Sequence, residues 1–368
     1  MKSKFCLTAV LVWTAFFTVV FSAFADEDSG NNYRKVTDFY EVTDALGRTV
    51  SFQAIPERIV LAGKAVLFSV NAMYLFPETA SRVVGVGATD QGLGDFFPFL
   101  DSDYRNKIRF GNNVGPEQIA GIRPDVVILK TYMKESLGNA LDSIGIPVLY
   151  IDLESSTRFY EDVFMLGDLL RTPERADSIV KYYKFRVESI SRTVKDVNRP
   201  TVLVLSYNEH DGEIAFNVPA AQWIQTFMVE TAGGTPVWKN TAFGQGWMKI
   251  NFEQISVWNP DFVFVVSYRT PAEKVVQKLQ QSSLWKALRA VEEGHIVPFP
   301  ADFSSWDQPD VRWILGLQWI ALKLHPELFP DLDMSREVLS FYADLYGIEA
   351  SVIRNEILPR IGSVPEAE

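Results

Sequence analysis

The feature that most constrains the fold of this 368-residue chain is a pattern that occurs twice. Glu-Gln-Ile, four variable residues and Pro-Asp stand at 117–125 and again at 253–261, each residue of the second copy lying 136 positions after its counterpart. An apolar run follows both copies, which favours a short helix, a proline turn and a strand. A chance match is the alternative, but the pattern favours a duplicated unit and predicts two similar lobes.

Short apolar runs alternate with stretches of helical spacing on both sides of this repeat. The runs are four to six residues long and are nearly continuous in hydrophobicity, as in parallel strands that are buried on both faces. They lie at 58–62, 83–88, 126–129 and 148–151, and then at 201–206, 262–266 and 296–299. We therefore predict an α/β fold of two similar β-α lobes with parallel-type sheets and a ligand cleft between the lobes.

A long amphipathic helix is predicted between the two series. Thr172 and Pro173 resemble a helix start, and apolar residues recur every three or four positions from 174 to 197. Such a helix would span about 36 Å, enough to join two lobes. The predicted order is a signal peptide, an N-terminal lobe, a connecting helical segment, a C-terminal lobe, and final helices with a tail. The boundaries are 1–25, 40–156, 157–198, 199–330 and 331–368.

The first 25 residues have the features of a cleaved export signal. Two lysines precede an apolar run at 5–21, and Ala-Phe-Ala at 23–25 gives a small-x-small pattern before Asp26. The run is just long enough to span a membrane, so an uncleaved anchor is the alternative. Cys6 is the chain's one cysteine and lies at the very start of this run, too near the N-terminus for a lipidated cysteine. We expect a soluble periplasmic protein, cleaved before Asp26 and without disulfides.

Composition and motifs give no indication of catalysis. The chain has 35 Lys and Arg against 46 Asp and Glu, a net charge of −11 that disfavours nucleic acid as a partner. Its histidines are scattered, and no H-E-x-x-H or G-x-S-x-G motif is present. The glycine-rich segment 83–94 does not match a phosphate-binding loop. We predict a protein that is not an enzyme, with no cofactor and no directly bound metal ion.

Candidate ligand-binding residues follow the predicted strands, where open α/β sheets bind ligands. Because the carboxyl ends of parallel strands meet at one edge, we expect these side chains to face one crevice. For each residue, an exposed loop position is the alternative. The candidates of this kind are Lys64, Tyr132, Tyr207, His210, Tyr268 and Arg269.

Aromatic residues and one more arginine extend the candidate set. Trp247 lies between glycines and Trp306 lies beside Asp307, so both are expected in loops that offer surfaces to a large ligand. Core packing is the favoured expectation for Trp223 and Trp238. Arg312 is added as a further cation of the crevice. Phe243 and Phe303 lie in similar glycine- and proline-broken segments.

Several motifs together resemble the substrate-binding proteins of ABC importers for iron-siderophores, haem and cobalamin. They are D-A-L-G-R-T-V at 44–50, I-P-E-R-I-V at 55–60, the two repeats, A-G-G at 232–234 and F-Y-x-x-L-Y-G at 341–347. The resemblance covers about residues 40–348 and implies two lobes joined by one rigid helix. It also implies an ABC permease and its ATPase as partners of a monomeric protein. Glu117 and Glu253 match the glutamates that pair with permease arginines in this family; solvated acids at a helix start are the alternative.

Binding is favoured over a periplasmic hydrolase or chelatase, because no nucleophile and base stand out as a pair. A signalling or adhesion module is a third alternative. A chelated metal is the expected ligand, because the candidates combine cations with aromatic residues whereas a bare ion requires clustered carboxylates or imidazoles. An anionic or polar iron-siderophore is favoured. Haem, with Tyr207 or His210 as an axial ligand, and cobalamin are the alternatives.

Overall fold

The computed structural model describes residues 39–210, 212–241, 244 and 246–362. The predicted signal peptide, its cleavage site, Phe243 and the end of the predicted tail lie outside these residues. None of the helices in the described part of the chain has the length and hydrophobicity needed to cross a membrane.

The N-terminal lobe is built on a sheet of five parallel strands in the order β5-β4-β3-β6-β7. All three residues of β3 and all five of β6 are buried, which explains why these runs lack a polar face. The strands are β3 (Ile59–Leu61), β4 (Val83–Val86), β5 (Ile108–Arg109), β6 (Val126–Lys130) and β7 (Val148–Ile151), and β1 (Tyr40–Thr43) and β2 (Thr49–Phe52) form a separate antiparallel hairpin. The helices are α1 (Val66–Met73), α2 (Thr79–Arg82), α3 (Phe97–Leu100), α4 (Pro116–Ala120) and α5 (Asn139–Ser143).

The C-terminal lobe has a mixed sheet in the order β11-β9-β8-β12-β13, with β10 also paired to β8. β8, β10, β12 and β13 are parallel, whereas β9 is antiparallel to β8 and β11. The strands are β8 (Thr201–His210), β9 (Glu213–Val218), β10 (Thr235–Pro236), β11 (Met248–Ile250), β12 (Phe262–Val266) and β13 (Ile296–Pro298). The helices are α8 (Ile224–Thr231), α9 (Phe252–Trp258), α10 (Ala272–Gln281) and α11 (Arg289–Glu292).

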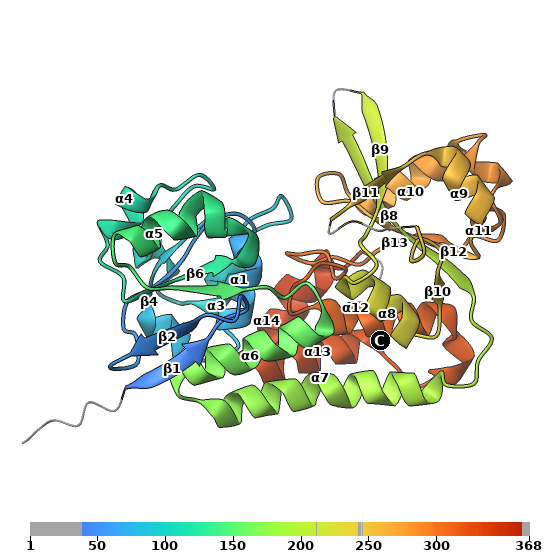
Figure 1. Cartoon of the computed structure of the whole chain (residues 1–368). Coiled ribbons are helices and arrows are strands. Elements are labelled where there is room, and N and C mark those ends of the chain that lie inside the picture. Colours follow the sequence, from blue (N-terminus) through green and yellow to red (C-terminus); the bar gives the residue numbers. More distant parts are fainter. Residues whose placement is uncertain (1–38, 211, 242–243, 245, 363–368) are drawn as a thin grey trace, which may run out of the picture. The chain divides into compact units, whose positions relative to one another are not determined.

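Two consecutive helices connect the lobes. α6 (Ser156–Leu170) follows β7, and α7 (Pro173–Thr193) leads into β8, so that the pair runs along one side of both lobes (Figure 1). α7 buries Ala176, Ile179, Tyr183 and Ile190, as its apolar spacing predicted, and ends at Thr193. α12 (Trp313–Leu324), α13 (Met334–Tyr346) and α14 (Ala350–Val352) follow the C-terminal lobe, and two short helical turns, Ile353–Ile357 and Leu358–Arg360, come after them. The predicted two-lobed α/β fold with a long connecting helix is confirmed, with one sheet mixed rather than wholly parallel.

Candidate functional site

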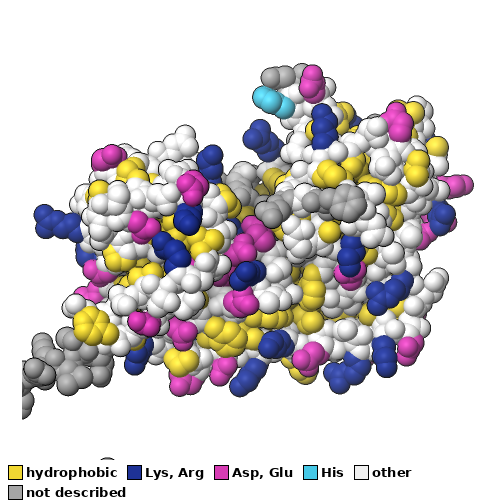
Figure 2. Space-filling view, viewed as in Figure 1, with side chains coloured by type: hydrophobic (Ala, Val, Ile, Leu, Met, Phe, Trp, Pro, Cys, Tyr) yellow, Lys and Arg dark blue, Asp and Glu magenta, His cyan; other side chains and the backbone are white. Residues whose placement is uncertain are grey.

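A cleft between the two lobes consists of two adjoining hollows. The large hollow has a volume of about 740 Å³ and the small hollow about 550 Å³. They share Ala65, Gln91, Tyr268 and Gln308. The lining segments of the N-terminal lobe follow β3, β4, β6 and β7, so the carboxyl edge of this sheet forms one wall, as the strand order predicts. Figure 2 shows the surface hollowed between the lobes, with charged side chains of both signs near the rim.

Aromatic side chains from both lobes line the large hollow. Trp247 lies edge to face with Trp223 and with Tyr268, at ring-centroid distances of 5.7 and 6.3 Å. Tyr132 is 53% exposed on the opposite wall, where its hydroxyl donates to the Lys64 carbonyl at 3.1 Å. Phe68 of α1 adds an apolar side chain to this wall. The hollow therefore offers flat apolar faces to a bound molecule.

Tyr268 follows β12 of the C-terminal lobe and is held by a buried acid. The Tyr268 hydroxyl donates to Asp307 at 2.7 Å. Burial raises the pKa of Tyr268 well above its usual value, and the neighbouring carboxylate acts in the same direction. The Asp307 carboxylate also accepts from Ser305 at 2.5 Å. Tyr268 is therefore a neutral, fixed part of the cleft wall.

A group of ion pairs lies on the wall formed by the end of β7. Lys130 is 1% exposed, and its ammonium lies 3.0 Å from Glu154 and donates to the Asp152 carbonyl. Arg158 lies 3.7 Å from Asp152 and 2.8 Å from Glu161. Because these charges are largely paired with one another, this wall carries little uncompensated charge.

The small hollow holds cations from opposite lobes. Lys64 follows β3 and Arg269 follows β12, and both side chains are exposed. Among the described residues, neither has an ion-pair partner. Asp90 supplies a carboxylate in the same hollow, where its Oδ1 accepts from the N–H groups of Gly92 and Gly94 at 2.6 and 3.0 Å. The arrangement leaves both cations available to an anionic or oxygen-rich group.

The structure brings together five of the nine predicted ligand-binding residues and separates the other four. The five that line the cleft are Lys64, Tyr132, Trp247, Tyr268 and Arg269. The expectation for Trp306 and Arg312 is wrong, because both are fully buried. The Trp306 indole donates to Asp302 at 3.1 Å, and Arg312 lies 2.8 Å from each of Asp302 and Asp310. They are parts of the protein interior.

Tyr207 and His210 also lie outside the residues that line the cleft. β8 does not end where the sequence suggested but continues to His210 and pairs with β9 as a hairpin. Tyr207 is 2% exposed, and its hydroxyl donates to Glu209 at 2.5 Å and accepts from Lys278 at 2.9 Å. His210 lies at the end of β8, in the exposed part of this hairpin. The expected axial ligation of haem by either residue is therefore not supported by their positions.

Several cleft residues were missed in the sequence. Asp152 and Glu154 follow β7 directly, so the strand-end rule applied to that strand would have identified them. Trp223 was assigned to the core but lines the large hollow, whereas Trp238 is fully buried as expected. The cleft also contains a set of amide side chains that no motif or spacing in the sequence indicated. They are Gln91, Asn112, Asn113, Gln222, Gln225 and Gln308.

The two repeated glutamates lie on α4 and α9, in the first turn of each helix. Both are exposed, and no hydrogen bond or ion pair joins either carboxylate to another described residue. α4 belongs to the N-terminal lobe and α9 to the C-terminal lobe (Figure 1). Glu117 and Glu253 thus occupy equivalent places in the two lobes and are open to a partner.

Comparison with known proteins identifies the family. A sequence model described as periplasmic binding protein matches residues 83–303, more than half of the chain. The chain belongs to the periplasmic binding protein family. It is therefore a substrate-binding protein of the ABC-transporter class, and the resemblance seen in the sequence motifs is confirmed.

The relatives of this chain are distant and bind different solutes. The molybdate-binding protein MolA of Haemophilus influenzae is 23% identical over 332 residues, covering 83% of this chain and 90% of that protein. The iron(3+)-hydroxamate-binding protein YxeB of Bacillus subtilis is 24% identical over 314 residues, covering 83% and 91%. A crystal structure of a periplasmic solute binding protein from Veillonella parvula superposes with a TM-score of 0.70 at 24% identity, covering 88% of this chain and 98% of that one. The last similarity establishes the fold alone.

Proposed function

We propose that this protein captures a chelated metal, of which an iron-siderophore is the favoured example, and delivers it to an ABC permease driven by its ATPase. The protein acts in the periplasm after removal of the N-terminal signal. The observation that carries this proposal is the cleft, which combines a volume of about 740 Å³ with aromatic faces, amides and two unpaired cations. Ligand sites for organic molecules of several hundred daltons have this size and mixture.

A bare metal ion fits this cleft poorly. No group of three or more His, Cys, Asp or Glu side chains within the described residues has the arrangement needed to hold a metal ion. An ion without a chelator requires such a set, because protein ligands must replace its water shell. A chelate brings its own donor atoms, so the protein has only to recognise the outside of the complex. The amides and aromatic faces of the large hollow suit that task.

The alternatives differ in what they require of the cleft. Haem would need an axial ligand, and the two candidates from the sequence, Tyr207 and His210, do not line the cleft. Tyr132 is accessible in the large hollow. Cobalamin is bulky and nearly neutral and would make less use of Arg269. Molybdate, named for the relative MolA, is a small anion that would fill only a fraction of the cleft.

Tryptophan fluorescence provides the test, because Trp223 and Trp247 both line the large hollow. The purified protein is titrated with ferrichrome, a ferric tricatecholate, haemin, cobalamin, molybdate and ferric citrate. Saturable quenching by a ferric siderophore at submicromolar concentration is expected. Replacing Trp247 with Phe should remove much of the quench, whereas replacing the buried Trp238 should leave it unchanged. Tight binding of molybdate or of iron without an organic chelator would overturn the proposal.

A further inference from the structure

A hydrogen bond between two glutamines joins the lobes at the cleft. The Gln308 amide Nε2 donates to Gln91 Oε1 at 3.0 Å. Gln91 follows β4 of the N-terminal lobe, and Gln308 lies in the segment between β13 and α12. Both residues line the large and the small hollow. This bond therefore lies where the two hollows meet, in contact with any ligand that extends from one to the other.

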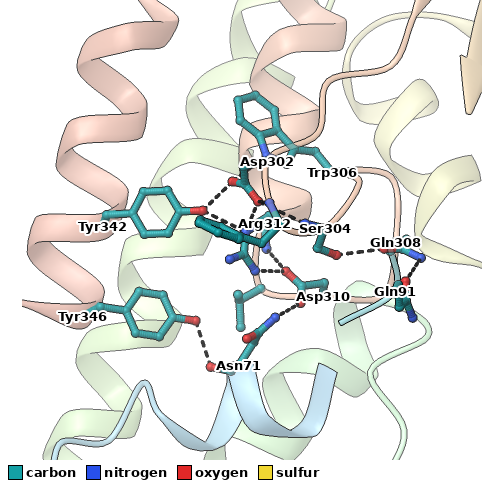
Figure 3. Close-up of polar contacts among 12 residues, drawn as sticks. Asn71, Gln91, Asp302, Ser304, Trp306, Gln308, Asp310, Arg312, Tyr342 and Tyr346 are labelled. Atoms are coloured by element: carbon teal, nitrogen blue, oxygen red, sulfur yellow. Dashed lines mark hydrogen bonds and ion pairs between the residues drawn. The ribbon is translucent and has the colours of Figure 1, made fainter. Parts of the chain in front are cut away.

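The Ser304 hydroxyl fixes the orientation of the Gln308 side-chain amide. Its side-chain Oε1 accepts from the Ser304 hydroxyl at 2.8 Å, so its Nε2 points toward Gln91 (Figure 3). Gln308 is 6% exposed and Ser304 is fully buried, so bulk water does not compete strongly for these bonds. The Ser304 backbone N–H donates in turn to Asp302 at 3.1 Å. The direction of the Gln308 amide is thus set by the segment that carries it.

Asp302 and Arg312 hold this segment in place. Arg312 Nε lies 2.8 Å from Asp302 Oδ1 and also donates to the Tyr342 hydroxyl at 2.8 Å. The Tyr342 hydroxyl and the Trp306 indole both donate to the other oxygen of Asp302. All these groups are buried and come from the segment before α12 and from α13 (Figure 3). A buried pair with these additional bonds has few alternative arrangements.

The same segment has a second attachment to the N-terminal lobe. Asp310 accepts from Asn71 of α1 at 2.5 Å, and its other oxygen lies 2.8 Å from Arg312. Tyr346 of α13 donates to the Asn71 carbonyl at 2.8 Å. Gln91 and Asn71 therefore fasten the segment to the N-terminal lobe at two places. Movement of one lobe relative to the other would break both attachments.

We propose that Gln91 and Gln308 determine ligand specificity by presenting N–H donors to acceptor oxygens on the surface of the chelate, with Ser304, Asp302 and Arg312 as their positioning residues. This proposal rests on the proposed function. The side-chain oxygens of Gln91 and Gln308 both already accept a hydrogen bond within the protein. The groups that remain for a ligand are therefore N–H donors, two on Gln91 and one on Gln308. Such a pair favours a ligand with neutral carbonyl or hydroxamate oxygens.

Gln91→Glu separates the donor role from the contact between lobes. The new carboxylate still accepts from Gln308, but it replaces the free N–H donors with an acceptor oxygen. Ferrichrome is the probe because it is neutral, so the added charge alone has little effect. We expect its dissociation constant to rise at least tenfold, while Gln281→Glu at the exposed end of α10 changes it less than twofold. Equal affinity in wild type and Gln91→Glu would overturn the donor role. If another chelate of the panel binds better, the same comparison is made with it.

Ser304→Ala tests positioning. It removes the hydroxyl that orients Gln308 without adding volume, and it should weaken ferrichrome binding severalfold. Ser340→Ala on α13 is the matched control, because it also removes a hydrogen-bonding hydroxyl but Ser340 is not among the residues that line the cleft. A loss that appears only in thermal stability, with affinity unchanged, would show that Ser304 has a purely structural role.

A measurement without ligand distinguishes failure of this inference from failure of the proposed function. Spin labels on the variant Ser143→Cys, Ser283→Cys, made in the protein without the signal segment that carries Cys6, report the distance between the lobes. The double variant Asn71→Ala, Gln308→Ala loses the side-chain bonds to Asp310 and Gln91 and keeps only the bond from Tyr346 to the backbone carbonyl of residue 71, so we expect a broader distance distribution than in wild type. An unchanged distribution would overturn the fastening of the lobes. If no chelate binds to the wild-type protein, the proposed function and the donor role of the glutamines are both wrong. The measured distance distribution would still show whether the two attachments hold the lobes together.

Discussion

Asp125 and Asp261 make the same contact in the two lobes. Oδ2 of Asp125 accepts from the backbone N–H of Arg58 at 2.9 Å, and Oδ2 of Asp261 accepts from the backbone N–H of Thr201 at 2.7 Å. The N–H of each aspartate donates back to the carbonyl of the same residue, at 2.8 and 2.9 Å. Arg58 immediately precedes β3, and Thr201 begins β8. The repeated Pro-Asp pair thus aligns the first central strand of each lobe with its parallel neighbour.

Replacing either aspartate with alanine should destabilise the protein. The Asp125 carboxylate accepts two hydrogen bonds and the Asp261 carboxylate accepts three, one of them from Arg289, so each change leaves a backbone donor at a strand start without its partner. We expect the free energy of unfolding, measured by urea denaturation, to fall by about 1–3 kcal/mol in each variant. Asp196→Ala, at an exposed position beyond α7, is the control and should change it by less than about 0.5 kcal/mol. Similar values for all three variants would contradict the anchoring role.

The sequence predicted best those features that depend on strand geometry. Lys64, Tyr132, Tyr268 and Arg269 were found because the carboxyl ends of parallel strands meet at one edge, and all four line the cleft. The same rule failed for Tyr207, because β8 does not end at that edge. The Asp-Gly pair at 211–212 lies between two strand-forming stretches and is a hairpin signal that the strand-end argument did not use.

The burial of Arg312 and Trp306 could not be predicted from the sequence. Their burial depends on Asp302 and on Tyr342, which is 30 residues beyond Arg312, and no local pattern predicts that contact. The cleft amides raise the same difficulty, because Gln91 and Gln308 are 217 residues apart and meet only in the folded chain. Residue types and spacing predicted the position of the cleft, whereas its polar lining is determined by contacts distant in sequence.

Arg312→Met should be strongly destabilising. It leaves the buried carboxylates of Asp302 and Asp310 without the cation between them, and both have side chains with no exposed surface. Removing one partner of a buried pair costs about 3–5 kcal/mol, because the remaining charge has lost its compensation. Urea denaturation should show a loss of this size. Arg269→Met removes the same charge at an exposed place in the cleft and should cost less than about 1 kcal/mol; equal losses in the two variants would refute the structural role of Arg312.

The proposed docking role of Glu117 and Glu253 predicts that transport and binding respond separately to mutation. The double variant to alanine should abolish uptake of the radiolabelled chelate by cells, because neither lobe then offers its carboxylate to the permease. Ligand affinity should remain near that of wild type, since neither residue lines the cleft. Each single variant should be only partly impaired. A control in which Glu174 and Glu292 are changed to alanine removes two exposed charges elsewhere. Undiminished uptake in the Glu117, Glu253 double variant would eliminate the docking role.

Asp162 should make stability depend on pH near neutrality. Burial raises its pKa to about 7, although the backbone N–H groups of Asp152 and Leu153 donate to its Oδ2 at 2.9 and 2.7 Å. In the unfolded chain the pKa of an aspartate is about 3.9. Between these values the folded state binds more protons than the unfolded state, so this group makes the free energy of unfolding fall as pH rises from about 4 to about 7.

Asp162→Asn should remove that dependence. A single amide oxygen can accept both backbone hydrogen bonds, and the side chain no longer has to ionise in the interior. We expect urea denaturation at several pH values from about 4.5 to about 7.5 to show that the free energy of unfolding of the variant increases relative to that of wild type. The increase should be up to about 1.4 kcal/mol per pH unit. Asp196→Asn, at an exposed site, should follow the wild-type curve. Parallel curves for wild type and Asp162→Asn would mean that Asp162 titrates at the same pH in the folded and unfolded states.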